Sequence, residues 1–276
     1  MQFIAKLTAA ERPPAVVGLA QWGTMDASKC TKHANRPELS TEPCSKFFDF
    51  DEEISEFFIF FVRWTRRPDE MYEDIVKLSY EGEPEKLKEL LSEPRTGQAY
   101  IKRFARFVME MMLVRGTDNF LTYVSELLAL IFTERPETLK SAETVKLEEI
   151  LQHPTMSDLI KRLAERRVER LSYQGMRDLQ KDLTEKLSFE IFSSSEALGQ
   201  AVQIIEIRNL LVHNRGIVNK TFQTRTGDSS LRVGSLFSLS PHSVIADLDF
   251  LAKSVLDEDE RAALKFNLAR SKAGER

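Results

Sequence analysis

Cysteine and histidine are scarce in this chain, and neither is arranged for cross-linking or for metal binding. The two cysteines, Cys30 and Cys44, lie 14 positions apart in a polar stretch, and no pair of the four histidines has ligand spacing. A disulfide framework or a closed zinc site needs several such residues at short intervals. We therefore expect no metal, no cofactor and a reducing, cytoplasmic setting.

Long apolar runs are also missing. The most apolar run, Phe57 to Val62, has six residues, whereas a membrane-spanning helix needs roughly 20. The first residues, Met1 to Lys6, do not combine a basic region with an apolar run, as a secretion signal does. The sequence thus predicts no membrane partner and no secretion signal.

Neither sign of charge dominates the composition. Lys and Arg number 39 and Asp and Glu number 43, which gives a formal charge of -4. No global basic field is available to hold a polyanion, so any contact with nucleic acid must come from a local patch. The usual motifs of phosphate-binding loops, dinucleotide sites, serine hydrolases and metalloproteases do not occur either.

Apolar residues at helical spacing are abundant, and 42% of the chain is hydrophobic. From Phe47 to Phe61 they recur every three or four positions, which is the period of a helix with one buried face. Similar stripes begin near Gln98, at Asp118, after Thr155, at Met176, at Ser194 and after Ser240-Pro241. Because there is no internal repeat and no alternation of strands with helices, we expect an all-α, up-and-down helical bundle.

Breaks in these patterns predict where helices and domains end. We expect Pro68 to end the first helix, and the stretch 116–118 to separate two others. Residues 222–240 lose the helical period and predict a small β-hairpin or an extended loop before the last helix. Residues 1–45 should be an irregular segment, or upstream sequence read from a misassigned start codon. A helical extension over 46–97 and the main helical domain over 98–276 follow.

Polar residues interrupt the segment Ser194 to Asn214, which is otherwise apolar around more than half of its circumference. Those in the second half of the segment are Glu206, Arg208, Asn209, His213 and Asn214, with Arg215 directly after them. At about 100° per residue, Glu206, Asn209 and His213 lie within roughly 60° of one another, and Arg208 lies about 140° from His213. Burial without partners would cost roughly 1–3 kcal/mol per group. This face should therefore meet solvent, a polar network or a second copy.

Gly216 is placed to follow the end of this helix, because glycine is favoured just beyond a helix C-terminus. His213 then lies in the last turn, where the helix dipole favours a cation.

The string from Arg208 to His213 has the form Arg-x4-His and resembles the motif of the HEPN family. Its context, IEIRNLLVHNRGIVN, is similar to the branch named after RiboL-PSP ribonucleases. The resemblance covers roughly residues 98 to 270 and includes Asp118 to Phe132, Leu171 to Leu179 and the closing helix. It implies a helical domain that dimerises, so that two motifs face each other across a cleft and cut single-stranded RNA without a metal ion.

The resemblance also assigns roles to individual residues. Arg208 would neutralise the scissile phosphate, His213 would transfer protons at the 2′-hydroxyl or the leaving oxygen, and Asn209 would orient these groups. Glu206, Asn214 and Arg215 would support them. The products would be a 2′,3′-cyclic phosphate and a 5′-hydroxyl.

The implied partners are single-stranded RNA, a second copy of the chain, and an antitoxin or defence partner, with a role as a toxin or phage-defence effector. Some members of the family are non-catalytic modules for RNA binding or dimerisation. That alternative stays open at this point.

A second basic feature is the run of Lys161, Arg162, Arg166, Arg167 and Arg170 at helical spacing. It is either a solvated helix face or a stripe that tracks RNA phosphates toward the dimer cleft.

Overall fold

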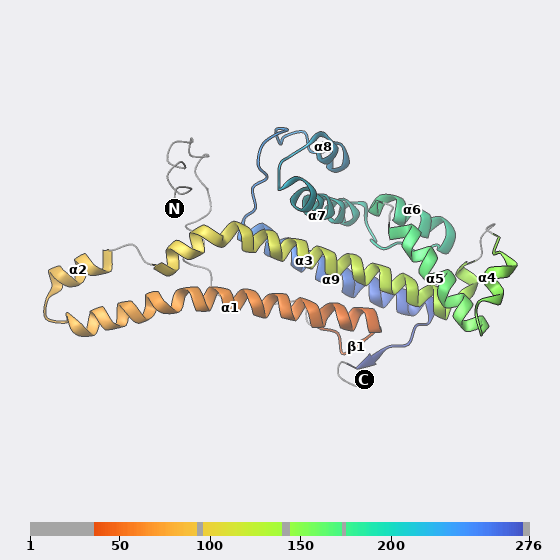
Figure 1. The fold of residues 1–276 in the computed structure, drawn as a ribbon, viewed down its shortest axis with the longest axis horizontal. Helices are drawn as coiled ribbons and strands as arrows, with labels where there is room; N and C mark the ends of the chain where they lie inside the picture. Colours follow the sequence, from red (N-terminus) through yellow and green to blue (C-terminus); the bar gives the residue numbers. More distant parts are fainter. Residues whose placement is uncertain (1–35, 93–95, 140–143, 173–174, 273–276) are drawn as a thin grey trace.

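The structure, a computed structural model, describes residues 36–92, 96–139, 144–172 and 175–272. They form an all-α bundle, as predicted, built around three long helices that lie side by side (Figure 1). These helices are α1 (Glu42–Ser79), α3 (Thr96–Glu134) and α9 (Pro241–Phe266). The shorter helices are α2 (Pro84–Ser92), α4 (Leu147–Leu151), α5 (Met156–Ser172), α6 (Met176–Leu187), α7 (Ser195–Asn214), α8 (Lys220–Thr226) and the 3-10 turn η3 (Pro136–Leu139).

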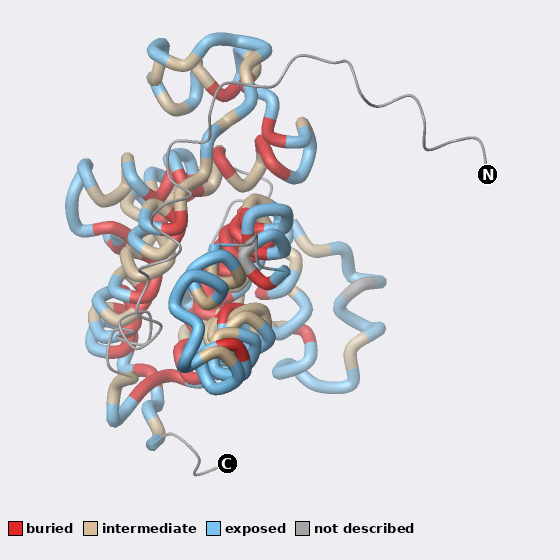
Figure 2. Tube along the Cα trace, turned by 90° about the vertical axis from the view of Figure 1, so that its left-hand side faces the viewer, coloured by how far each residue is buried: buried red, intermediate tan, exposed pale blue. Residues whose placement is uncertain are grey.

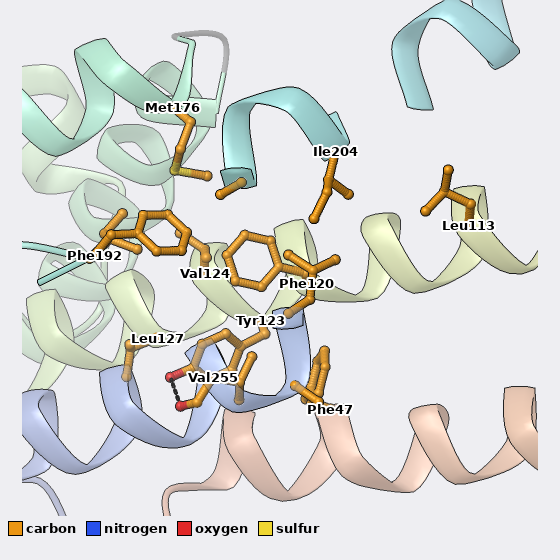
Figure 3. Close-up of a cluster of buried hydrophobic side chains, with 14 of the residues drawn as sticks. Phe47, Leu113, Phe120, Tyr123, Val124, Leu127, Met176, Phe192, Ile204 and Val255 are labelled. Carbon is orange, nitrogen blue, oxygen red and sulfur yellow. Dashed lines mark hydrogen bonds between the residues drawn. The ribbon is translucent and has the colours of Figure 1, made fainter. Parts of the chain in front are cut away.

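The core forms around α3, with α1 on one side of the layer made by α3 and α9, and with α7 and α8 on the other (Figure 1). Buried positions lie on the sides of the helices that face their neighbours (Figure 2). Near the middle, Tyr123 is buried between α1 and α9, and its hydroxyl donates to the carbonyl of Val255 at 3.4 Å (Figure 3). Phe47 of α1 and Phe120 of α3 belong to the same cluster. One core therefore serves the predicted extension and the predicted main domain.

The prediction that Pro68 ends the first helix is wrong, because α1 continues through it to Ser79. A proline inside a helix removes one hydrogen bond. The buried apolar positions, however, stay in phase across it: Phe58 and Val62 lie before Pro68, and Val76 lies four turns after Val62 on the same face. Packing of this continuous face outweighs the local cost of the proline.

The predicted break at 116–118 is also wrong, since α3 runs through these residues without interruption. Gly116 faces α9 so closely that a Cβ atom would lie 2.2 Å from Leu248 Cδ2. Thr117 is fully buried, and its hydroxyl donates to the carbonyl of Leu113 at 2.7 Å. The small residues permit close packing of two helices and do not mark a loop.

Residues 222–240, all of them described, contain no hairpin of their own, so of the two expected alternatives the structure confirms the extended loop. The chain forms α8 and then an extended loop that pairs with the residues just after α7. In this pairing, Val218 N–H donates to Ser235 O at 2.9 Å, and Phe237 N–H donates to Gly216 O at 2.8 Å. Local alternation in 222–240 could not reveal a partner that lies earlier in the chain.

The expected irregular segment 1–45 lies outside the described residues up to residue 35, and its last part is ordered. Strand β1 (Leu39–Ser40) pairs in antiparallel fashion with β2 (Ser271–Lys272). Thr41 caps α1, and its backbone N–H donates to Asp259 Oδ2 at 3.1 Å while its hydroxyl donates to Oδ1. Cys44 is buried, and this burial, together with the nearby Asp259, raises the pKa of its thiol. These few residues close the bundle against the end of α9.

Candidate functional site

Helix α7 is anchored along most of its length by apolar packing. Ser194 caps its first turn by accepting from Ala197 N–H at 3.1 Å. Its buried side chains are Ala201, Val202, Ile204, Ile207, Leu210 and Leu211. Because these positions hold one face of α7 against the core, the polar residues among them are held at fixed angles around the helix.

The C-terminal end of α7 matches the expectation for Gly216. Asn214 is the last helical residue, Arg215 is the C-cap with φ 52°, and Gly216 follows with φ 76°. Gly216 N–H donates to Leu210 O at 3.0 Å, which satisfies one of the open carbonyls at the helix end. His213 thus lies in the last turn, as predicted, and is exposed.

A polar hollow of about 290 Å³ lies between α7 and α8. Glu206, Asn209, His213 and Asn214 contribute from α7, and Asn219, Thr221 and Arg225 line it from α8 and the turn before it. The predicted clustering of Glu206, Asn209 and His213 on one face is confirmed. Apart from Leu210 and Phe222, every lining residue carries a polar group that can bind a ligand.

Helix α8 adds a charged residue that sequence reasoning missed. Asn219 caps α8 by accepting from Phe222 N–H at 2.8 Å, which turns the helix back along α7. Arg225 Nη1 then lies 3.2 Å from Glu206 Oε1 and 3.4 Å from Oε2. The Glu206 side chain is only 13% exposed, so Arg225 supplies the counter-charge that its burial requires. The Asn cap was the local signal that could have indicated α8.

Arg208 lies outside the residues that line the hollow, in agreement with its predicted angle of about 140° from His213 around the helix. Its Nε and Nη2 atoms both lie 2.7 Å from Asp118 Oδ1 on α3. Its Nη1 atom donates to Asn209 Oδ1 at 3.1 Å. The pair with Asp118 is partly exposed, so it contributes on the order of 1 kcal/mol to stability. Its larger effect is to fix the direction of the guanidinium.

Asn209 connects the two parts of the site, because it accepts from Arg208 and also lines the hollow next to His213. Arg208 has five N–H donors, and those on its Nη atoms that do not face Asp118 and Asn209 can bind a phosphate oxygen. The amides and hydroxyl in the hollow can hold a sugar or base. An exposed imidazole beside them is suited to proton transfer.

The remaining predicted residue, Arg215, is exposed at the C-cap and is not among the residues that line the hollow. Asp118 was missed as a functional candidate because it lies 90 positions from Arg208.

The basic run on α5 is more than a solvated face, since part of it packs against α6. Arg167 Nη2 lies 2.6 Å from Asp182 Oδ2, and Lys186 also pairs with that carboxylate. Arg166, Arg167 and Arg170 line a pocket of about 710 Å³ whose other walls include apolar residues of α5, α6 and the η3 region. This pocket is separate from the hollow beside His213, and the two share no lining residue.

Within the described ranges, no three or more His, Cys, Asp or Glu residues are grouped so that they could hold a metal ion. None of the helices in that part of the chain is both long enough and apolar enough to span a membrane. Comparison of the chain with models of protein families, with curated proteins and with solved structures finds no match.

Proposed function

We propose that this chain is an endoribonuclease that cleaves single-stranded RNA without a metal ion, with His213 and Arg208 as catalytic residues. The observation that carries the proposal is the link through Asn209: a fixed guanidinium on one side, and an exposed imidazole in a polar hollow on the other. The resemblance to the HEPN motif supports the same assignment of roles.

In the proposed reaction, the 2′-hydroxyl oxygen of RNA attacks the adjacent phosphorus atom, and the bond to the 5′-oxygen breaks. His213 accepts the proton of the 2′-hydroxyl, or donates a proton to the leaving 5′-oxygen. Arg208 stabilises the extra negative charge on the phosphate in the transition state. The products are a 2′,3′-cyclic phosphate and a 5′-hydroxyl, and no metal is required because RNA supplies its own nucleophile.

Among the described residues of one chain, His213 is the single imidazole at this site, whereas the reaction moves two protons. We therefore propose that two copies bring their α7 hollows together, so that one His213 acts as base and the other as acid. A role as a toxin or phage-defence effector, with an antitoxin or defence partner and a cytoplasmic location, completes the proposal.

A second candidate is a non-catalytic module for RNA binding or dimerisation. It is favoured by the pairing of Arg208 with Asp118, because an arginine whose charge is already matched can serve to join α7 to α3.

The two candidates differ in what happens to RNA in EDTA. The proposed enzyme should convert a 5′-labelled single-stranded RNA into fragments that end in a 2′,3′-cyclic phosphate. Binding without cleavage would support the module instead, and fragments with 3′-hydroxyl ends would contradict the mechanism.

A further inference from the structure

Helix α1 carries a second apolar stripe in addition to the face that packs on α3. Its members are Phe57, Phe60, Trp64, Met71, Ile75 and Leu78, and they are 45–80% exposed. At about 100° per residue they fall within roughly 60° of one another. The inner face of Phe58, Val62 and Val76 is centred roughly 140° away by the same measure. The helix is therefore apolar on two separate sides, and within the described part of the chain only the inner side is buried.

This surface is larger than a monomer ordinarily exposes. A large aromatic or aliphatic side chain offers on the order of 150–250 Å², so the six exposed fractions amount to roughly 700 Å² of apolar area. The largest patch on a typical monomer is about 300–600 Å². A stable interface buries about 800 Å² per partner. The stripe thus nearly provides the area that one side of a stable dimer needs.

The charges beside the stripe identify the partner. On one flank, Arg63 and Arg67 lie toward the start of the stripe, and Glu70 and Asp74 lie toward its end. If a second copy lies antiparallel across a two-fold axis, its Glu70 and Asp74 lie beside Arg67 and Arg63. The same register sets Trp64 opposite Met71 of the second copy. Arg67 and Glu70 also pair within the chain at 3.7 Å, an exposed pair that can be shared with the second copy.

The local shape fits this arrangement. A shallow hollow of about 490 Å³ beside the stripe is lined by Glu56, Ile59, Phe60, Arg63, Trp64 and Arg67. It lies where the antiparallel register brings Met71 and Ile75 of the second copy.

We propose that the chain forms a two-fold antiparallel dimer through this outer stripe of α1. The dimer does not depend on the proposed ribonuclease activity. It uses the side of the bundle opposite to α7, so each α7 hollow stays open to its own partner (Figure 1).

The test is the molar mass of the full chain in solution, measured by size-exclusion chromatography with light scattering over a range of concentrations. The expected result is that Trp64→Glu halves the molar mass of the assembly, because the α1 contact is lost while any contact through the α7 hollows remains. Arg177→Glu, an exposed change on α6, should leave the dimer intact. Circular dichroism checks that each variant keeps its helical content.

Charge reversal tests the identity of the partner. A chain with Arg63→Glu and Arg67→Glu should have half the molar mass of the unchanged chain, as should a chain with Glu70→Lys and Asp74→Lys, because each then presents one sign of charge along the stripe. Mixed together, they should form a heterodimer, since each negative flank meets a positive one. A chain that stays monomeric at high concentration, or a dimer that Trp64→Glu leaves unchanged, would overturn the proposal.

Discussion

At the scale of single residues, Asp118 decides how Arg208 can be used. From α3, Asp118 binds the Nε and Nη2 atoms of Arg208. Asn209, which lies next to Arg208 on α7, accepts a hydrogen bond from Nη1. The direction of the guanidinium is thereby fixed without a bound ligand, while the carboxylate of Asp118 neutralises part of its positive charge. Arg208 should thus contribute position as well as charge to phosphate binding.

Replacing Asp118 with Asn separates these two effects. We expect Asp118→Asn to lower kcat about tenfold while KM falls or stays the same, because the guanidinium loses the carboxylate that neutralises and orients it. Steady-state cleavage of single-stranded RNA measures both constants. A variant with unchanged kcat would show that Asp118 serves only to join α3 to α7.

Glu258 is the most strongly buried acidic residue among those described, and its Oε2 atom has no hydrogen-bond partner there. Burial raises the pKa of Glu258 well above 4.5, although nearby Arg261 opposes the shift. The folded protein therefore holds a proton that the unfolded chain releases above pH about 4.5. Stability from this group is fully present below that pH and is lost as pH rises toward the folded pKa.

Glu258→Gln removes this titration and keeps the size of the side chain. The melting temperature of the variant minus that of the unchanged protein should rise between pH 5 and pH 8. Asp247, whose pKa burial raises to about 6, has the same effect in both proteins and cancels in the difference. Glu260→Gln, an exposed change on the same helix, is the control. A difference that does not vary with pH would contradict the assignment.

At the scale of elements, α1 and α3 come into close contact at Gly97. Its N–H donates to Asp69 Oδ1 at 2.9 Å, and a Cβ atom there would lie 2.0 Å from the carbonyl oxygen of Thr65. That oxygen belongs to the backbone and cannot move without distorting α1. The close pairing of α1 and α3 at this point thus requires a glycine, which has no side chain, at position 97.

Gly97→Ala should destabilise the fold by about 1–3 kcal/mol, because it overpacks this contact. Gly199→Ala is the matched control in α7, where nothing lies within 4 Å of the added atom. It should stabilise the fold by roughly 0.5–1 kcal/mol, as alanine does in a helix interior. Urea unfolding measures the change in the free energy of unfolding for each variant. Changes of the same sign in both variants would contradict the close contact at Gly97.

At the scale of the whole molecule, the periodicity of apolar residues predicted the features that residues close together in the sequence determine. The stripes located most helices, including the start of α9 after Ser240-Pro241, and the common face of Glu206, Asn209 and His213. Packing between distant segments was out of reach of such patterns. The helix continues through Pro68, Gly116 contacts α9, and Asp118 reaches Arg208 because residues far apart in the chain meet in the bundle.

The same holds for the candidate site. Four polar residues of the hollow, Glu206, Asn209, His213 and Asn214, could be predicted because they share one helix. Arg225 depends on how α8 turns back along α7. The outer stripe of α1 could not be predicted, because the expected end of the helix at Pro68 divides it. Only the structure distinguishes the exposed side of α1 from its buried side.

The central claim is that His213 performs proton transfer in metal-independent RNA cleavage. Its most direct test is the decay rate of a labelled single-stranded RNA in EDTA, compared among the unchanged chain, His213→Ala and His242→Ala. His242 is an exposed histidine in the first turn of α9 and serves as the matched control. We predict that His213→Ala abolishes cleavage, with an unchanged melting temperature, and that His242→Ala cleaves at the original rate. Equal decay by His213→Ala and the unchanged chain would contradict the account.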